Sequence, residues 1–291
     1  MANTERNAMP VGCFGLAGSY TYEAMQAYFA GQAIQPVYGS HFEDVIQAVV
    51  TREVRYGVVP IENSSTGGIT DIYDLIHRYD CHIVGEKYIK IEHNLLGLPG
   101  ATLQDIEEIY SHPQGLSQCR NYLKYHDWKL HPYFSTSQSA EKIRDEQDIR
   151  LGAIANKTAA DMYGLQVLAS HINDNTMNYT RFFIVSADAE ESDEMDKITL
   201  VLTTQHKPGA LYHVLGHFFY NAMNMTHLES RPIKGRPFEY FFHIDVMGNL
   251  RNPVTARVLN NLAQHCNYFK ILGNYISDRG GNPDEIRCNR S

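Results

Sequence analysis

An acidic segment divides the chain into two parts that differ in their pattern of apolar residues. Residues 187–196 (ADAEESDEMD) contain almost no large apolar side chain, which is typical of a solvated connection between domains. We therefore predict a first domain at residues 9–187, a linker at 188–196, a second domain at 197–277 and a tail at 278–291.

The first part of the chain predicts a mixed α/β domain. Residues 11–14 are an apolar run of strand length, whereas residues 22–30 and 102–108 are predicted helices. Ser40 and Glu43 form a capping-box pattern ahead of another helical run. Strands that alternate with helices predict a layered α/β fold, and the length leaves room for two lobes with a cleft between them.

The second part follows a simpler order. Four apolar runs of strand length and two segments with helical spacing alternate as βαββαβ, which is the ferredoxin-like arrangement. The predicted strands are residues 198–203, 225–230, 238–246 and 269–275, and the predicted helices are 209–221 and 253–266. Because domains of one topology serve many functions, the order of elements alone assigns none.

Composition argues against several classes of protein. The chain has 25 basic and 33 acidic residues and a net charge of −8, which argues against binding to nucleic acid. No run of 18 apolar residues occurs and the first ten residues lack the apolar core of a signal peptide, so we expect no membrane span and a cytoplasmic protein. The five cysteines show no CxxC spacing and no HExxH occurs, so we expect neither a disulfide framework nor a metal site.

Four segments concentrate polar side chains close to predicted strand ends. They are residues 15–23 (GLAGSYTYE), 59–68 (VPIENSSTGG), 111–120 (SHPQGLSQCR) and 178–182 (NYTRF). Ligand sites of α/β sheets open at the carboxyl ends of strands, where helix N-termini also attract anions. The candidate site residues taken from these segments are Glu62, Asn63, Ser64, Ser111, Gln118, Asn178, Thr180, Arg181 and Phe182.

Each segment also has an ordinary structural interpretation. The first two could be turns that cap a following helix, and Arg181 could form a salt bridge at a strand edge. His112 and Cys119 together invite a Cys-His nucleophile. Cys119, however, lies one helical turn after Leu116 and is expected in the core, so we do not favour that chemistry.

In this order and spacing, the motifs resemble those of prephenate dehydratases followed by a regulatory ACT domain. The most specific are PIENSSTGG at 60–68, SHPQ with the downstream QC at 111–119, and TRF at 180–182. In the second domain they are GAL at 209–211 and ESRP at 229–232. The resemblance implies an α/β fold: a two-lobed catalytic domain like that of periplasmic binding proteins, with the active site in the cleft, and then a ferredoxin-like ACT domain.

The resemblance also implies a reaction, in which prephenate loses its ring hydroxyl as water and its ring carboxylate as CO2 to give phenylpyruvate for phenylalanine synthesis. No cofactor is expected, because aromatisation of the ring supplies the driving force. The family assigns the threonine of TRF, here Thr180, to the departing hydroxyl, with Glu62 as the alternative acid. Arg181 is expected to hold the pyruvyl-side carboxylate. The other expected neighbours of the substrate are Asn63, Ser64, Ser111, Gln118, Asn178 and Phe182.

For the second domain, the resemblance implies feedback by L-phenylalanine bound between two ACT domains, and therefore a homodimer or a homotetramer. Only ten residues precede the first predicted strand, so we expect no chorismate mutase domain of the kind that some relatives carry at this end. The expected effector contacts are Gly209, Ala210 and Leu211 on one wall and Glu229, Ser230, Arg231 and Pro232 on the other.

Two rival functions remain beside this one. An arogenate dehydratase performs the same chemistry on the amino-acid analogue of prephenate, and the motifs do not distinguish the two substrates. A non-catalytic phenylalanine sensor would use the same pair of domains. We would expect such a sensor to have a broken TRF or PIEN segment, and both are intact here.

Overall fold

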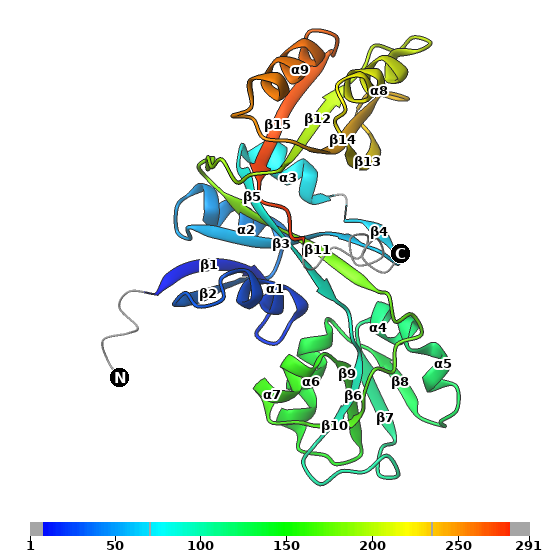
Figure 1. Ribbon diagram of the computed structural model, residues 1–291. Helices are drawn as coiled ribbons and strands as arrows, with labels where there is room; N and C mark the ends of the chain where they lie inside the picture. The colour runs from blue at the N-terminus through cyan, green and yellow to red at the C-terminus, as the bar shows by residue number, and fades with distance from the viewer. Residues whose placement is uncertain (1–7, 70, 234, 280–291) are drawn as a thin grey trace.

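The computed structural model describes residues 8–69, 71–233 and 235–279. These residues form two β-sheets with helices packed against them, arranged as two lobes and a C-terminal domain (Figure 1). The mixed α/β fold with two lobes that the sequence predicts is therefore confirmed. None of the described helices is long and apolar enough to cross a membrane.

The larger sheet runs through the first lobe and the C-terminal domain. Its strand order is β13-β14-β12-β15-β5-β11-β3-β1-β2, with β4 paired to β3. The first lobe contributes β1 (Met9–Phe14), β2 (Ile34–Gly39), β3 (Tyr56–Asn63), β4 (Gly67–Gly68), β5 (His82–Lys90) and β11 (Tyr179–Ser186). The C-terminal domain contributes β12 (Lys197–Thr203), β13 (Met225–Pro232), β14 (Tyr240–Met247) and β15 (Tyr268–Tyr275). The two groups meet where Gly273 of β15 pairs in parallel with Ile83 of β5.

The second lobe has a sheet of its own, in the order β10-β6-β9-β7-β8. Its strands are β6 (Asn94–Gly97), β7 (Glu108–Ser111), β8 (Lys129–Pro132), β9 (Leu151–Ala155) and β10 (Gln166–Ala169). Its helices are α4 (Pro113–Gln118), α5 (Arg120–Leu123), α6 (Thr136–Glu146) and α7 (Lys157–Tyr163). The chain enters this lobe after β5 and returns before β11, so these two neighbouring strands lead from one lobe to the other (Figure 1).

Helices cover the large sheet on both faces. In the first lobe α1 (Tyr20–Tyr28) packs on one face, while α2 (Phe42–Val50) and α3 (Asp71–Tyr79) pack on the other. In the C-terminal domain α8 (Ala210–Tyr220) and α9 (Pro253–Ala263) cover one face. The opposite face of that domain meets α3, and Val201 and Leu272 join the apolar cluster around Ile72 and Ile76. The predicted ACT domain and the first lobe thus share one hydrophobic core.

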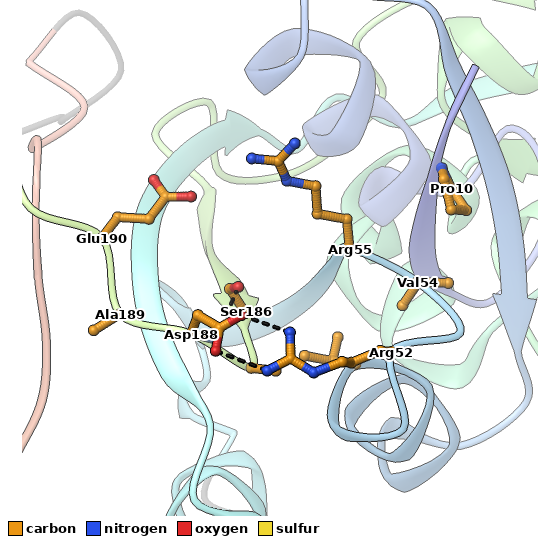
Figure 2. Close-up of a pocket in the computed structure, with 10 residues that line it drawn as sticks. Pro10, Arg52, Val54, Arg55, Ser186, Asp188, Ala189 and Glu190 are labelled. Atoms are coloured by element: carbon orange, nitrogen blue, oxygen red, sulfur yellow. Dashed lines mark hydrogen bonds and ion pairs between the residues drawn. The ribbon is translucent and has the colours of Figure 1, made fainter. Parts of the chain in front are cut away.

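The acidic linker is anchored to the protein by its carboxylates. Asp188 accepts two hydrogen bonds from the guanidinium of Arg52, at 2.6 and 2.8 Å, and Glu190 accepts one from the Tyr56 hydroxyl. Figure 2 shows Asp188 and Glu190 on one side of a pocket of about 530 Å³, with Arg52 and Arg55 facing them. The acidic residues, which in the sequence suggest a freely solvated linker, thus bind the linker to the first lobe.

Most predicted elements are present, and several details differ. Residues 102–107 contain a turn rather than a helix, because Asp105 accepts hydrogen bonds from the backbone and hydroxyl of Thr102 and closes a turn there. The capping box before α2 uses His41 and Asp44, one residue later than the predicted pair of Ser40 and Glu43. Strands β2, β4, β5, β6, β8 and β10 were not predicted. In β5, charged residues interrupt the apolar run, so the sequence gives little sign that the strand is buried.

Candidate active site

A pocket of about 670 Å³ lies between the two lobes. The first lobe lines it with the turn after β1, the end of β2, the end of β3 and the start of β11, and the second lobe with α4 and the first turn of α6. The parallel strands β1, β2 and β3 all end at this pocket, as expected for a ligand site in an α/β fold. Gln114 Nε2 in the second lobe donates to Thr66 Oγ1 in the first, at 3.2 Å, across its mouth.

Four of the nine candidate site residues line this pocket. They are Asn63, Gln118, Thr180 and Phe182, which come from three of the polar segments of the sequence. The turn of the remaining segment also lines it, with Gly15, Leu16, Ser19, Tyr20 and Thr21. All four segments therefore meet at one place.

The hydroxyl of Thr180 is held in a fixed position at the pocket wall. Its Oγ1 accepts a hydrogen bond of 2.9 Å from Nδ2 of Asn63, and the residue is 8% exposed. Because the oxygen serves as an acceptor here, the hydroxyl hydrogen is left to donate, and no acceptor for it is found among the described residues. Thr180 is thus an oriented donor beside the cavity.

Asn63 is the centre of the network that orients Thr180. Its Oδ1 accepts from the backbone N–H groups of Ser65 and Thr66, at 3.0 and 3.2 Å, which fixes the direction of the amide. Its Nδ2 also donates to Oδ1 of Asn178, at 2.9 Å, and this oxygen accepts from the Ser65 hydroxyl. Asn178 therefore supports the pocket from behind and is absent from its lining.

Gln118 presents an unused donor at the other side of the pocket. Its Oε1 lies 2.8 Å from Nε2 of His93, so that ring nitrogen carries the hydrogen. Nδ1 of His93 lies 3.1 Å from the Tyr20 hydroxyl. Burial lowers the pKa of His93, which keeps the ring neutral at pH 7. Nε2 of Gln118 is buried without a hydrogen-bond partner among the described groups, and such an atom has most to gain from a ligand.

The pocket has no cationic side chain among its described lining residues. Its only titratable imidazoles are His93 and His112, and burial lowers the pKa of both. Two helices of nine and eleven residues begin at the wall instead: α1 is capped by Ser19 and α6 by Ser135, and both cap residues line the pocket. Their N-termini supply partial positive charge without a formal one.

Arg181 lies elsewhere, and the structure does not bring its side chain to the pocket where the predicted clamp would act. Successive residues of a strand point to opposite faces, so Thr180 and Phe182 face the pocket while Arg181 faces the C-terminal domain. There its guanidinium meets the carboxylates of Glu86, at 2.7 Å, and Asp245, at 2.6 Å, and it is 3% exposed. The environment of Arg181 agrees with the alternative interpretation of this residue as a member of a salt bridge.

Glu62 follows the same alternation on β3. It is absent from the pocket lining, whereas its neighbour Asn63 is present, so the structure does not support Glu62 as the alternative acid. Its carboxylate lies 3.5 Å from Nδ1 of His227 in the C-terminal domain. His227 in turn lies 3.6 Å from the carboxylate of Glu229, so an imidazole separates one acidic residue from each domain.

The two predicted serines also have structural partners outside the pocket lining. The Ser111 hydroxyl is fully buried and donates to the carbonyl of Ile154, at 2.8 Å. The Ser64 hydroxyl accepts from the backbone N–H of Tyr179, at 2.9 Å, and so ties the loop after β3 to β11. Burial raises the pKa of Cys119 to about 12, so its thiol remains protonated and does not provide a nucleophile.

Comparison with known proteins decides the family. The family model described as prephenate dehydratase matches residues 11–190, which contain both lobes and every wall of the pocket. The chain belongs to the prephenate dehydratase family. Members of this family are lyases, and the resemblance of the first-domain motifs to prephenate dehydratases is thereby confirmed.

Individual relatives agree with this membership. A prephenate dehydratase of Methanocaldococcus jannaschii is 37% identical over 223 residues, covering 75% of this chain and 80% of the relative. Among solved structures, the prephenate dehydratase of Arthrobacter aurescens in complex with L-Phe has a TM-score of 0.83 at 29% identity, with 95% of this chain and 91% of that chain covered. GqqA, described as a novel type of quorum quenching acylase, has a TM-score of 0.84 at 31% identity, covering 92% of this chain and 98% of that one.

The predicted effector residues of this prephenate dehydratase family member divide between two surfaces. Gly209 caps α8 in a left-handed conformation with φ of 81°, which glycine adopts without strain, and Ala210 and Leu211 begin the helix. On β13, Ser230 and Pro232 are exposed. Their neighbours Glu229 and Arg231 face the first lobe: Glu229 lies against Gly68, and Arg231 forms an ion pair of 3.0 Å with Asp74 of α3.

Several lining residues were missed in the sequence analysis. They are Tyr38 and Ser40 at the end of β2, His93 between the lobes, and Ser135, Thr136, Ser137 and Gln138 at the start of α6. The run STSQS ahead of a helical pattern signals a cap and was available from sequence. His93 gave no such signal, since its contact with Gln118 joins residues 25 positions apart.

Proposed function

We propose that the chain converts prephenate to phenylpyruvate, water and CO2 in the pocket between the lobes. The carbon–carbon bond to the ring carboxylate breaks and CO2 is released, the electron pair of that bond completes the aromatic ring, and the ring hydroxyl leaves as hydroxide, which takes a proton from solvent to become water. The single observation that carries this proposal is the Thr180 hydroxyl, which is fixed by Asn63 and left to donate into a pocket of the prephenate dehydratase family.

Thr180 acts on the hydroxyl that leaves. Hydroxide is a poor leaving group, so a donor must stabilise negative charge as it develops on that oxygen. A threonine hydroxyl is a weak acid, and we therefore give Thr180 the role of an oriented hydrogen-bond donor rather than a source of the full proton. A donor of this kind contributes about 3–4 kcal/mol to the stability of the transition state.

The two substrate carboxylates are bound by neutral groups. The N-termini of α1 and α6, their serine caps and the free Nε2 of Gln118 supply hydrogen-bond donors without a formal charge. A cation held tightly against the leaving carboxylate would stabilise the ground state, because negative charge moves out of that group in the transition state. A pocket without lysine or arginine in its described lining is therefore suited to decarboxylation.

We further propose that the C-terminal domain is an ACT domain that binds L-phenylalanine at an interface between two copies of the chain. Its strand β13 is an edge strand of the large sheet, and Leu228 on it is 42% exposed. The neighbouring face of the domain exposes aromatic side chains on α8, namely Tyr212, Phe219 and Tyr220. An unpaired edge beside exposed aromatic residues favours pairing of two such domains. Gly209–Leu211 with Ser230 and Pro232 would form the effector site.

A cytoplasmic location fits the cysteine chemistry. Cys13, Cys81 and Cys119 are buried as free thiols, and none of them pairs in a disulfide. Unpaired thiols are usual in a reducing compartment. The biosynthetic reaction we propose would take place there.

The test is a direct assay of the purified protein. Phenylpyruvate formation from prephenate and phenylalanine formation from arogenate are measured in parallel, each with and without added L-phenylalanine, while sedimentation reports the oligomeric state. Turnover of prephenate that falls when L-phenylalanine is added supports both proposals. Preference for arogenate would replace the substrate but keep the site.

If neither prephenate nor arogenate were turned over, the proposed activity would be overturned. L-phenylalanine binding without turnover would then favour the sensor, and hydrolysis of an N-acyl amide would favour the activity described for GqqA. A monomer in the presence of L-phenylalanine would overturn the shared effector site.

A further inference from the structure

A buried group of charged residues joins the C-terminal domain to the strand that carries Thr180. The first lobe supplies Arg181 and Glu86, and the C-terminal domain supplies Lys197 and Asp245, so each side contributes one cation and one anion. All four residues are 3% exposed or less. Two ion pairs cross the junction, Arg181 with Asp245 and Lys197 with Glu86, and these form only when the two domains are docked.

The contacts around Arg181 form a closed ring of hydrogen bonds and one ion pair. Its Nε donates to Glu86 at 2.8 Å, and its Nη2 donates to the Tyr275 hydroxyl at 2.9 Å. Tyr275 and Thr199 lie 2.8 Å apart at their hydroxyls, and Thr199 donates to Oδ1 of Asp245 at 2.7 Å. Oδ2 of Asp245 lies 2.6 Å from Nη1 of Arg181, an ion pair without hydrogen-bond geometry, and this contact closes the ring.

The pairing of β11 with β3 is irregular next to Thr180. Arg181 lies opposite Glu62 and Phe182 opposite Pro60, so Ile61 of β3 is the extra residue. A bulge interrupts the regular ladder of hydrogen bonds and re-aims side chains. Because Thr180 and Arg181 are consecutive and point to opposite faces, fixing the Arg181 side chain fixes the direction in which Thr180 points.

We infer that Asp245 is a positioning residue for the reaction: it acts from the C-terminal domain, through Arg181, to hold the Thr180 hydroxyl in its productive direction. Asp245 does not touch the pocket. The inference rests on the role proposed above for Thr180. Through these contacts, a movement of the C-terminal domain would change the position of Thr180 at the active site.

The first experiment replaces Asp245 by asparagine in the full-length protein. We expect kcat to fall about tenfold while KM for prephenate changes less than about twofold, since the substrate contacts remain. In a Thr180→Ala background the same replacement should change kcat by less than about twofold, because the residue through which Asp245 acts has been removed. Thr199→Val, which removes one donor to Asp245, is the milder second variant and should show a smaller effect of the same kind.

Asp80→Asn is the matched control. It removes an ion pair with Lys270 across the same domain junction, but far in sequence from β11 and outside the ring around Arg181. We expect its kcat to match that of the parent protein. An equal loss in Asp80→Asn and Asp245→Asn, or an equal loss with and without Thr180, would show that Asp245 only supports folding and would overturn the inference.

Hydrogen exchange of backbone amides tests the link between Asp245 and β11 without relying on turnover of prephenate. Backbone amides of residues 179–183 should exchange faster in Asp245→Asn than in Asp80→Asn, whatever the substrate. Faster exchange in a protein that does not turn over prephenate would contradict the proposed function and retain the mechanical link. Unchanged exchange and unchanged kcat in an active protein would contradict the link alone.

Discussion

At the scale of single residues, the hydroxyl of Thr180 is expected to act in the chemical step. Replacement by alanine should lower kcat by about 10²–10³-fold, because the donor to the departing hydroxyl is lost. Replacement by serine, which keeps the hydroxyl, should retain activity within about tenfold. Steady-state kinetics with prephenate checks both. An alanine variant within a few-fold of the parent protein would remove Thr180 from the mechanism.

Arg181 gives the second prediction at this scale. Arg181→Gln leaves Asp245 and Glu86 buried without their shared cation, so the free energy of unfolding should fall by about 3–5 kcal/mol. KM for prephenate should change less than about threefold, because Arg181 does not face the pocket. Urea unfolding and initial rates measure the two effects.

The control for Arg181 is an arginine of similar geometry at the surface. Arg52 forms a bidentate pair with Asp188, but both side chains are about two-thirds exposed, with values of 66% and 67%. Arg52→Gln should therefore lower the free energy of unfolding far less than Arg181→Gln, because solvent screens an exposed ion pair. A tenfold rise in KM for Arg181→Gln with unchanged stability would restore the carboxylate clamp that the sequence suggested.

The motifs alone could predict which segments form the site but not which side chains face it. Thr180, Asn63, Gln118 and Phe182 line the pocket, whereas Arg181 lies on the opposite face of its strand. The alternation of side chains along a strand was available from sequence and separates Thr180 from Arg181. The partner of Arg181 was not, since Asp245 is 64 residues later and in another domain.

At the scale of elements, the junction of β15 and β5 requires a glycine. A β-carbon at Gly273 would lie 2.1 Å from the carbonyl oxygen of Ile83, which is a backbone atom that cannot move aside by rotation of a side chain. Gly273→Ala should therefore lower the free energy of unfolding by about 1–3 kcal/mol or more, because the two strands must separate. Urea unfolding followed by tyrosine fluorescence measures the change.

Gly216→Ala is the matched control for this substitution. Gly216 lies within α8, and the nearest atom to its added β-carbon would be 3.6 Å away in Tyr220. Alanine in a helix should stabilise the protein by about 0.5–1 kcal/mol. If Gly273→Ala proved as stable as the parent protein, the large sheet would not be tightly joined at this point.

Most elements with a clear apolar period could be predicted from the sequence, whereas several short strands and the charged strand β5 could not. The βαββαβ order of the C-terminal domain and most helices of the lobes are present. Strand β5 carries Glu86 and Lys87, whose burial depends on Lys197 and Asp278 far along the chain. Burial of charge requires a partner, and a partner distant in sequence leaves no local signal.

At the scale of the whole molecule, the junction between the first lobe and the C-terminal domain combines a shared core with buried polar groups. Tyr73 of α3 stacks on His243 of β14, with ring centroids 4.1 Å apart. The Tyr73 hydroxyl and both ring nitrogens of His243 are buried without hydrogen-bond partners among the described residues. Such atoms weaken the docked state relative to a fully paired one. The stability of such a junction can depend on pH, whereas that of a purely apolar core does not.

Acidification should loosen this junction. Burial lowers the pKa of His243 to about 3 from 6.5, so between these values the unfolded chain binds a proton that the folded protein does not. The contribution of neutral His243 to stability is complete above pH 6.5 and is lost as the pH falls toward 3, at up to about 1.4 kcal/mol per pH unit. The charged and titratable groups around the ring are Asp74, His227, Arg231 and Asp245.

The measurement is the free energy of unfolding of the parent protein and of His243→Leu between pH 4 and pH 8. At pH 8 the variant should be about as stable as the parent, because it removes two unpaired nitrogens along with the ring contacts. Below pH 6.5 the parent should lose stability faster, since only its ring titrates in the unfolded state. His206→Leu, at an exposed position, should follow the parent profile. Parallel profiles for the parent and His243→Leu would show that His243 takes no part in acid destabilisation, and the carboxylates of the junction would then account for it.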